Sequence, residues 1–388
     1  MKIITFFLLL FQINFGSFQR PVKRVIKYEK TELALTAKSH VLMDYESREV
    51  LYQNNEHEKL FPASMTKMMG MLLVLEAIDD KKLSWTDMVT PTSEACSMGG
   101  TQIFLAPNES MSVEDLFKSV AINSANDAIV ALGEKVSGSH ASFVEKMNKR
   151  SKELNMNDTH FANATGFDNP EHYTSAYDMG LLACELLTHN EDILRFTRLK
   201  ESYIRTDTEN PFWLVNTNKL LGHYDGLDGL KTGYTNLAGY NLTATAQREG
   251  VRLVSVTMGA DSIKNRSQDT VKLLNHGFSK LERVALFTKD EIMTRVDFKN
   301  AKNKETPIYP KTDVAPTFPK GTKEGDLDIS IMLTKDSAPL KAEEEVGYLS
   351  IKYQGQEKKY PLIVKEDVEN KKYLDYLSDS LLEIFSLN

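Results

Sequence analysis

The segment FPASMTKMMG, residues 61–70, places a hydroxyl and an amine where they could act together. Ser64 stands three residues before Lys67, and in a helix such positions lie about 4.5 Å apart along the axis and about 60° apart around it. Pro62 fits a first helical turn, which would put Ser64 at the positive end of the helix, where an alkoxide is favoured. The apolar residues after Lys67 would desolvate its amine and lower its pKa, so that the amine could accept the serine proton.

The same two residues also have an ordinary structural interpretation. Ser64 could be a helix cap, and Lys67 could reach the surface along its apolar stem. The spacing of this pair alone does not decide between the two interpretations.

Two further segments carry complementary groups. INSANDA contains Ser124 and Asn126 where a loop enters a helix, which offers a hydroxyl to shuttle a proton and an amide to hold a peptide carbonyl. GLKTGYT places Lys231, Thr232 and Gly233 at the start of the final hairpin, and a residue without a side chain would let a substrate approach. Taken alone, the first pair could be N-caps and the second segment a turn. The three motifs in this order together indicate an active site.

The surrounding patterns predict elements that could position these groups. Residues 40–45 and 49–52 alternate polar and apolar side chains and predict a hairpin, and residues 238–260 predict a second one. From residue 64 the sequence predicts a helix buried on nearly every side. Amphipathic helices are predicted at 113–119, 126–135, 140–154 and 176–188. Strands at both ends with helices between them imply an antiparallel sheet carrying helices, an α+β fold, over residues 30–282.

A second domain and two special termini are also predicted. After residue 283 the alternating runs predict a small β-sandwich, residues 283–366. Residues 369–388 place apolar side chains on one helical face and predict an amphipathic helix that could cap a domain or anchor the chain to a membrane. Residues 1–17 have the basic start and short apolar core of a secretory signal, so export is expected, with an uncleaved anchor as the alternative.

Composition excludes several classes of partner. The 388-residue chain carries a formal net charge of −7, which argues against a nucleic-acid binder. Its two cysteines, Cys96 and Cys184, and the absence of Cys-x-x-Cys and His-Glu-x-x-His predict no disulfide framework, no metal site and no cofactor. A bridge between Cys96 and Cys184 stays open as an alternative to two buried thiols.

From about residue 38 to 365, the sequence resembles the low-molecular-mass penicillin-binding proteins, specifically the serine-type D-alanyl-D-alanine carboxypeptidases of the peptidase S11 family. Besides the three motifs, the likeness includes SMGGTQIFL, MNKRSKELNMNDTHFANATGFD, YTSAYDMGLLACELL and GLDGLKTGYTNLAGYNLTATA. The resemblance implies a transpeptidase-like catalytic domain, a β-rich domain after it, and a C-terminal amphipathic helix. That helix would attach the exported protein to the outer face of the bacterial cytoplasmic membrane, next to the cell wall.

The resemblance also implies a role for each motif residue. Ser64 would attack the carbonyl between the two D-alanines that end a peptidoglycan stem peptide, and Lys67 would take its proton. Ser124 would relay a proton to the leaving amine. Asn126 would hold the peptide carbonyl or orient Lys67, and Lys231 would supply positive charge.

Recognition of the oxyanion and of the terminal carboxylate is implied in the same way. Backbone N–H groups of Ser64 and Tyr234 would form the oxyanion hole. Thr232 and Arg266, the latter in SIKNRSQ, would bind the terminal carboxylate. A β-lactam would acylate Ser64 and leave slowly.

Three alternatives remain in view. A class A β-lactamase would need a Glu-x-x-Leu-Asn segment, whereas this chain has Glu153-Leu154-Asn155 without the two intervening residues. A D,D-endopeptidase or transpeptidase would use the same chemistry on crosslinks. A catalytically silent wall-binding module would be expected to lack Ser64, Lys67 or Lys231, and all of them are present.

Overall fold

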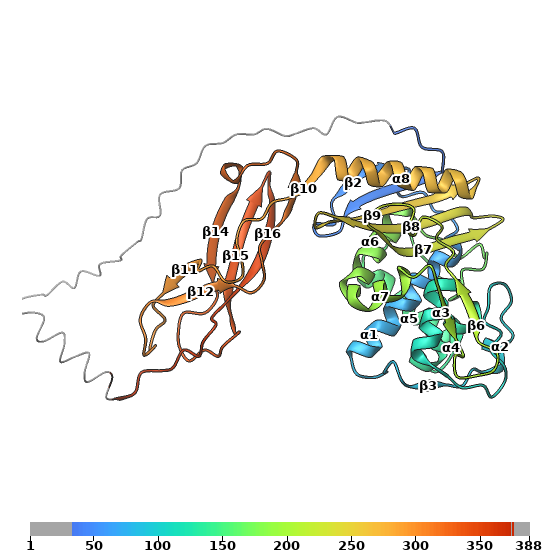
Figure 1. The fold of residues 1–388 in the computed structure, drawn as a ribbon, viewed down its shortest axis with the longest axis horizontal. Helices are drawn as coiled ribbons and strands as arrows, with labels where there is room; N and C mark the ends of the chain where they lie inside the picture. Colours follow the sequence, from blue (N-terminus) through green and yellow to red (C-terminus); the bar gives the residue numbers. More distant parts are fainter. Residues whose placement is uncertain (1–32, 374, 376–388) are drawn as a thin grey trace, which may run out of the picture.

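The computed structural model describes residues 33–373 and 375. The predicted signal segment lies outside the described residues, as does the predicted tail helix apart from residues 369–373 and 375. Two folded parts follow each other along the chain, a mixed domain of helices and strands and a smaller β-rich domain (Figure 1). Within the described residues, no helix combines the length and the apolar character needed to span a bilayer.

An antiparallel sheet of five strands forms the centre of the first domain, in the order β2-β1-β9-β8-β7. Its strands are β1 Ser39–Asp44, β2 Val50–Asn54, β7 Leu227–Thr235, β8 Gly239–Arg248 and β9 Val251–Ala260. Both predicted hairpins are confirmed, since β1 pairs with β2 and β8 pairs with β9. The β8–β9 turn consists of Glu249 and Gly250, with φ of 49° and 80°, the left-handed conformation that tight hairpin turns require.

Helices cover both faces of this sheet (Figure 1). Helix α8, Ile263–Lys280, covers one face. The other helices are α1 Lys67–Asp79, α2 Ser93–Cys96, α3 Val113–Asn123, α4 Asn126–Ser137, α5 His140–Glu153, α6 Ala176–Leu186 and α7 Asn190–Thr197. The side chains of β1 alternate between the two faces of the sheet. Val41 and Met43 belong to the core between the sheet and these helices, whereas Leu42 belongs to the core between the sheet and α8. The predicted α+β fold and its helices are confirmed.

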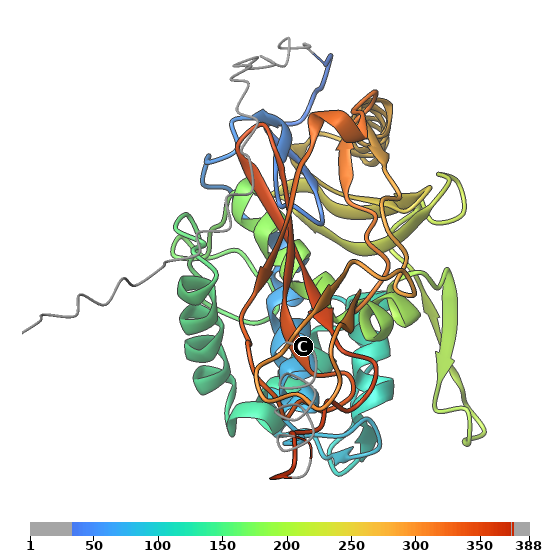
Figure 2. The same cartoon turned by 90° about the vertical axis from the view of Figure 1, so that its left-hand side faces the viewer.

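Two small strand pairs were not predicted. Strand β3, Met88–Val89, pairs with β4, Met111–Ser112. Strand β5, Glu201–Ile204, pairs with β6, Phe212–Val215, in a hairpin that projects from the side of the first domain (Figure 2). These strands are two to four residues long, too short for an alternating pattern to stand out in the sequence.

The second domain is built from strands, as predicted. One sheet has the order β11-β12-β16-β15-β14, and β10 pairs with β13 beside it. The strands are β10 Leu281–Arg283, β11 Thr294–Val296, β12 Thr306–Pro310, β13 Thr317–Pro319, β14 Asp328–Leu333, β15 Glu345–Tyr353 and β16 Gln356–Ile363. Strand β10 follows α8 directly and pairs with β13 of the β-rich domain.

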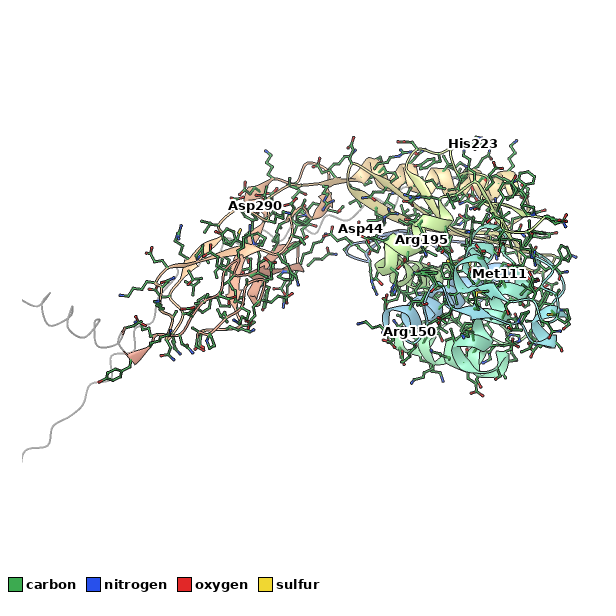
Figure 3. The ribbon with its side chains drawn as sticks, turned by 60° about the horizontal axis from the view of Figure 1, so that its bottom comes forward. Asp44, Met111, Arg150, Arg195, His223 and Asp290 are labelled. Atoms are coloured by element: carbon green, nitrogen blue, oxygen red, sulfur yellow. The ribbon has the colours of Figure 1, made fainter. Side chains whose placement is uncertain are left out.

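One glutamate joins the two domains. Glu46, in the β1–β2 turn, accepts hydrogen bonds from the Tyr360 hydroxyl at 2.8 Å and from the Thr317 backbone N–H at 3.1 Å. The Lys358 amine lies 3.5 Å from the same carboxylate. Asp44, at the end of β1, lies on the side of the first domain that faces the β-rich domain (Figure 3). Polar contacts at the β1–β2 turn therefore connect the two domains in addition to the direct connection from α8 to β10.

Candidate active site

Ser64 lies in a tight turn just before the long buried helix. A 3₁₀ turn covers Ala63–Thr66, and α1 begins at Lys67, whereas the sequence predicted one continuous α-helix. A 3₁₀ turn has three residues per turn, so residues i and i+3 eclipse each other. The Ser64 Oγ and the Lys67 Nζ are 3.0 Å apart as a result. The predicted pair therefore exists, with a 3₁₀ turn in place of the predicted start of the α-helix.

The amine of Lys67 is enclosed. Lys67 is fully buried, and its Nζ donates a hydrogen bond to the Thr165 carbonyl at 2.6 Å. Burial, and after it the charge of Lys231, lowers the pKa of Lys67 well below its usual value, while Asp127 opposes this shift. A neutral amine can donate one N–H to Thr165 and accept the Ser64 proton with its lone pair. The alternative of a lysine that extends to the surface is wrong.

The second motif lies at the junction of two helices. Ser124 ends α3 in the left-handed conformation, with φ of 68°, and Ala125, not a serine, caps α4. Ser124 is 5% exposed, and its Oγ has no hydrogen-bond partner among the described residues. The N-cap alternative for Ser124 is therefore wrong, and a buried hydroxyl without a partner is available to a substrate.

Asn126 is fixed by the loop above it. It begins α4, and its Nδ2 donates to the Gly99 carbonyl at 2.8 Å. The hydrogen bonds of Lys67 go to Ser64 and Thr165, so within the described residues the amine is oriented by the Thr165 carbonyl and not by Asn126.

The third motif belongs to the sheet edge. Lys231, Thr232 and Gly233 lie within β7, so the alternative of a turn is wrong. Lys231 is 1% exposed, and burial, followed by the charge of Arg266, lowers its pKa to about 7. A Cβ added at Gly233 would lie 2.6 Å from the carbonyl oxygen of Pro62. The glycine thus lets the sheet edge touch the turn that carries the candidate nucleophile.

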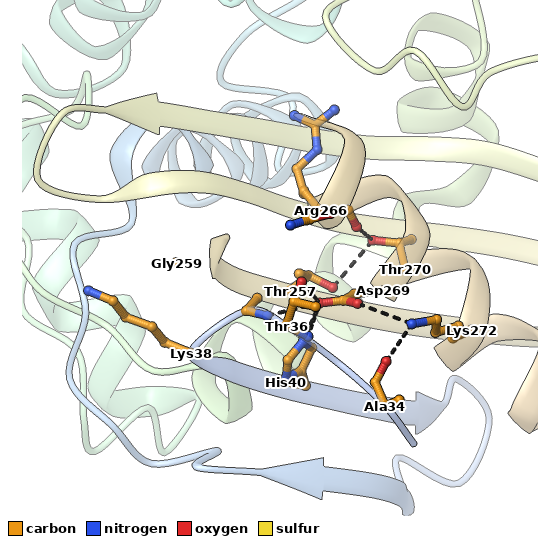
Figure 4. A network of polar contacts seen from close by, with 12 residues as sticks. Ala34, Thr36, Lys38, His40, Thr257, Gly259, Arg266, Asp269, Thr270 and Lys272 are labelled. Atoms are coloured by element: carbon orange, nitrogen blue, oxygen red, sulfur yellow. Dashed lines mark hydrogen bonds and ion pairs between the residues drawn. The ribbon is translucent and has the colours of Figure 1, made fainter. Parts of the chain in front are cut away.

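Arg266 is a buried cation beside this edge. It lies in α8 with 3% exposure, and its Nε and Nη2 have no hydrogen-bond partner among the described residues. Burial lowers the pKa of its guanidinium to about 10, although Tyr240 opposes the shift. The guanidinium points away from the contacts of Asp269 with Thr36 and His40, which join α8 to the start of β1 (Figure 4).

The remaining predicted residues lie at the end of β7. The Thr232 and Thr217 hydroxyl oxygens are 2.6 Å apart. Tyr234 is 52% exposed, and its ring stacks on Tyr240 with the centroids 4.4 Å apart. Charge interactions therefore connect Lys67 with Lys231 and Lys231 with Arg266, and Gly233 brings β7 against the turn that carries Ser64.

A loop that the sequence analysis did not assign completes the site. The Thr165 carbonyl of this loop accepts the hydrogen bond from Lys67. The next residue, Gly166, touches the turn Ala63–Thr66, here called the nucleophile turn after the candidate Ser64, because a Cβ at residue 166 would lie 2.0 Å from the Ala63 carbonyl oxygen. The Asn163 side chain shapes this loop by accepting N–H bonds from Thr165 and Gly166. Asn-x-Thr-Gly is a recognisable turn signal. It does not reveal which distant residue the turn will contact.

Family models match both domains. The model described as D-alanyl-D-alanine carboxypeptidase matches residues 26–262, and the model described as penicillin-binding protein 5, C-terminal domain, matches residues 281–370. D-alanyl-D-alanine carboxypeptidase DacF of Bacillus subtilis is 41% identical over 353 residues, 90% of each chain. DacC of Escherichia coli is 36% identical and covers 87% of this chain and 85% of its own.

Solved structures agree with these matches. Penicillin-binding protein 5 of Haemophilus influenzae superimposes with a TM-score of 0.68 at 31% identity, covering 88% of this chain and 99% of its own. Penicillin-binding protein D2 of Listeria monocytogenes, in its ampicillin-bound form, gives a TM-score of 0.57 at 33% identity. It covers 64% of this chain and 99% of its own.

Proposed function

The chain belongs to the peptidase S11 family of D-alanyl-D-alanine carboxypeptidases, and from this membership we propose which of its residues carry out the reaction. It is a serine-type D-alanyl-D-alanine carboxypeptidase of the penicillin-binding protein family and acts in peptidoglycan metabolism. It has the two-domain architecture of these proteins, with the catalytic domain first and the β-rich domain second.

The assignment of the nucleophile and its base rests on one observation above all, the 3.0 Å separation between Ser64 Oγ and the buried Lys67 Nζ. Ser64 attacks the carbonyl between the two terminal D-alanines, and its proton passes to Lys67. The C–N bond then breaks, and Ser124, with its buried unpartnered hydroxyl, relays a proton to the leaving amine of D-alanine. Water hydrolyses the resulting ester and regenerates Ser64.

The groups around this pair have the chemistry that the charged parts of the substrate require. The backbone N–H groups of Ser64 and Tyr234 stabilise the oxyanion, where loss of one donor typically costs about 2.7 to 4 kcal/mol. Arg266 and Thr232 bind the terminal carboxylate, and an unpaired buried guanidinium supports this role. Lys231 supplies positive charge, and Asn126 holds the peptide carbonyl. β-Lactams present the same carbonyl and acylate Ser64.

The alternatives receive less support. Glu153, the only candidate for a deacylating β-lactamase glutamate that the sequence offered, ends α5, where it lies 3.6 Å from Arg150 with a half-exposed side chain. Endopeptidase or transpeptidase activity would use the same acyl-enzyme, so it differs only in the attacking group. A silent wall-binding module would not need a desolvated amine beside a serine.

We further propose how the protein is placed in the cell. The family acts on peptidoglycan, on the cell-wall side of the cytoplasmic membrane. Residues 1–17 direct export, and residues 369–388 hold the enzyme at the outer face of that membrane through their apolar helical side. Residues 30–282 form the catalytic domain and residues 283–366 the β-rich domain.

The experiment that tests the site is covalent labelling with a fluorescent penicillin. The purified wild type should be labelled and should release D-alanine from a pentapeptide. Ser64→Ala should not be labelled, and its release of D-alanine should fall by at least about 10⁴-fold. Ser142→Ala, at an exposed serine of α5, is the control and should behave as wild type. Labelling of Ser64→Ala would overturn the assignment. Hydrolysis of a crosslinked dimer measured beside the pentapeptide separates carboxypeptidase from endopeptidase activity.

A further inference from the structure

A buried chain of hydrogen bonds ends on the peptide group that precedes the nucleophile. The Thr66 hydroxyl donates to the Ala63 carbonyl oxygen at 2.8 Å, and the Nε2 of His172 lies 2.7 Å from the same hydroxyl. Thr66 and Ala63 are fully buried and His172 is 1% exposed. None of the predicted roles uses Thr66 or His172.

Only one arrangement of protons satisfies this chain. The backbone N–H of Ala162 can only donate, so the Nδ1 of His172, 2.9 Å away, must accept. A neutral ring then carries its proton on Nε2 and donates it to Thr66, whose own proton is left for Ala63. Burial, followed by the charges of His160 and Lys67, lowers the pKa of His172 to about 4, which keeps the ring neutral near pH 7. All the bonds therefore run in one direction, from Ala162 toward Ala63.

The last acceptor matters because of the geometry of the peptide bond. Among the described residues, the cis bonds are Gly229-Leu230 and Ala338-Pro339, so the bond between Ala63 and Ser64 is trans. In a planar trans peptide the C=O and the N–H point in opposite directions. Holding the Ala63 carbonyl therefore fixes the direction of the Ser64 N–H.

The backbone here needs such support. Ala63 has φ of 49°, in the left-handed region that alanine rarely occupies. Gly166 packs against the same peptide group, since an added Cβ would lie 2.0 Å from the Ala63 carbonyl oxygen and 2.9 Å from the Ser64 nitrogen. The hydroxyl of Thr66 and the backbone of Gly166 therefore both restrict the orientation of the Ala63–Ser64 peptide group.

We propose that Thr66 and His172 are positioning residues of the oxyanion hole, which aim and polarise the Ser64 N–H through the Ala63 carbonyl. The inference rests on the proposed function, because it requires that this N–H stabilise the oxyanion. Each hydrogen bond in a chain strengthens the next, so the chain makes Ser64 N–H a better donor when negative charge develops. Its effect falls on the transition state and therefore on kcat more than on KM.

The test removes single links of the chain. Thr66→Val keeps the shape and deletes the hydroxyl, whereas Thr66→Ser restores it. His172→Asn keeps an acceptor for Ala162 and loses the donor to Thr66, and His172→Gln does the reverse. Release of D-alanine and the rate of acylation by fluorescent penicillin are measured for each variant, with thermal unfolding to establish that each is folded.

Thr66→Val should lower kcat and the acylation rate by about 10- to 100-fold, with KM within about threefold of wild type. Thr66→Ser should lie within about threefold of wild type, and His172→Gln should retain more activity than His172→Asn. Ser151→Ala on α5 is the control, because it also deletes a buried hydroxyl that donates to the carbonyl three residues earlier. It should leave both rates unchanged.

A thiono substrate separates positioning from general structural support. Sulfur in place of the reacting carbonyl oxygen fits an oxyanion hole poorly, so wild type should prefer an oxo ester of a D-alanyl peptide over its thiono analogue. Thr66→Val should reduce this preference, whereas a structural defect would slow both substrates alike. A folded Thr66→Val with wild-type kcat, or with an unchanged oxo-to-thiono ratio, would refute the inference. Unlabelled wild type, or labelled Ser64→Ala, would instead refute the proposed function.

Discussion

The buried guanidinium of Arg266 lowers the stability of the free protein, although it has a proposed role in binding the substrate carboxylate. Its guanidinium is buried, and two of its nitrogens lack a partner among the described residues. A buried charge without a partner is costly, and burial accordingly lowers the pKa of this side chain to about 10. The free-energy cost of this buried charge is expected at a binding site, because a bound anion supplies the missing partner.

We predict that Arg266→Met stabilises the protein and disables it. The free energy of unfolding should rise by about 1 kcal/mol or more, because an apolar side chain replaces an uncompensated charge. The kcat/KM for D-alanine release should fall by about 100-fold or more, because the substrate carboxylate would lose the cation that we propose binds it. Urea unfolding and substrate kinetics measure the two effects.

Arg150→Met is the matched control for this prediction. Arg150 bonds to Glu76 and Glu185, each at 2.7 Å, so its loss should lower stability while activity is retained. If Arg266→Met also lost stability, the guanidinium would have partners that offset its burial in the free enzyme.

The motif residues could be predicted from the sequence, because a serine and a lysine three positions apart face each other in any helical turn. Thr165 and His172 could not be predicted in the same way. Thr165 acts through a backbone carbonyl, which every residue possesses, and only the folded chain shows that it meets the Lys67 amine. The role of His172 depends on Thr66, which lies more than 100 residues away along the chain.

At the scale of elements, two glycines from different parts of the chain pack against the nucleophile turn Ala63–Thr66. Gly166 approaches it from the loop before α6, and Gly233 approaches it from β7. The sequence explained Gly233 as room for the substrate. The structure gives it a further task, because the Pro62 carbonyl, the Ala63 Cβ and the Met65 nitrogen all lie within 3.2 Å of where its Cβ would be.

Gly233→Ala should therefore displace the nucleophile turn from the sheet edge. We expect acylation by fluorescent penicillin to slow by about 100-fold, since small misplacements of reacting groups have effects of this size. Gly325→Ala is the control, because a Cβ there would meet nothing within 4 Å. Wild-type acylation by Gly233→Ala would mean that the turn and β7 can separate without loss of geometry.

The elements themselves were predictable to different degrees. Long strands with alternating side chains and helices with an apolar stripe were visible in the sequence. The 3₁₀ turn was not, because Ala63–Thr66 carries no signal that separates it from the α-helix it leads into. The sequence placed Lys231, Thr232 and Gly233 at the start of the final hairpin but did not give the extent of β7, because its buried polar residues break the expected alternation.

At the scale of the whole molecule, stability should depend on pH through buried neutral histidine. The folded-state pKa of His172 is about 4, below the ordinary value of 6.5. Between these values the unfolded chain binds a proton that the folded chain does not, so stability falls as the pH falls. The contribution is at most about 1.4 kcal/mol per pH unit for one such group.

We predict that wild type loses stability relative to His172→Gln as the pH decreases from 6.5 toward 4. The difference in unfolding free energy between the two proteins, from urea titrations at several pH values, gives the effect of this one histidine. His40, whose pKa is also lowered by burial, is present in both proteins and cancels. Parallel pH curves for the two proteins would contradict the prediction.

The junction of the two domains has a mechanical consequence. Helix α8 ends at Lys280 and β10 begins at Leu281, so no loop separates the helix from the β-rich domain. A linker of several residues would allow the two domains to rotate relative to each other, whereas here the β-rich domain follows the helix without such a linker. A change in the orientation of the β-rich domain would therefore act directly on α8, the helix that carries Arg266, and the Glu46 contacts restrain such a change.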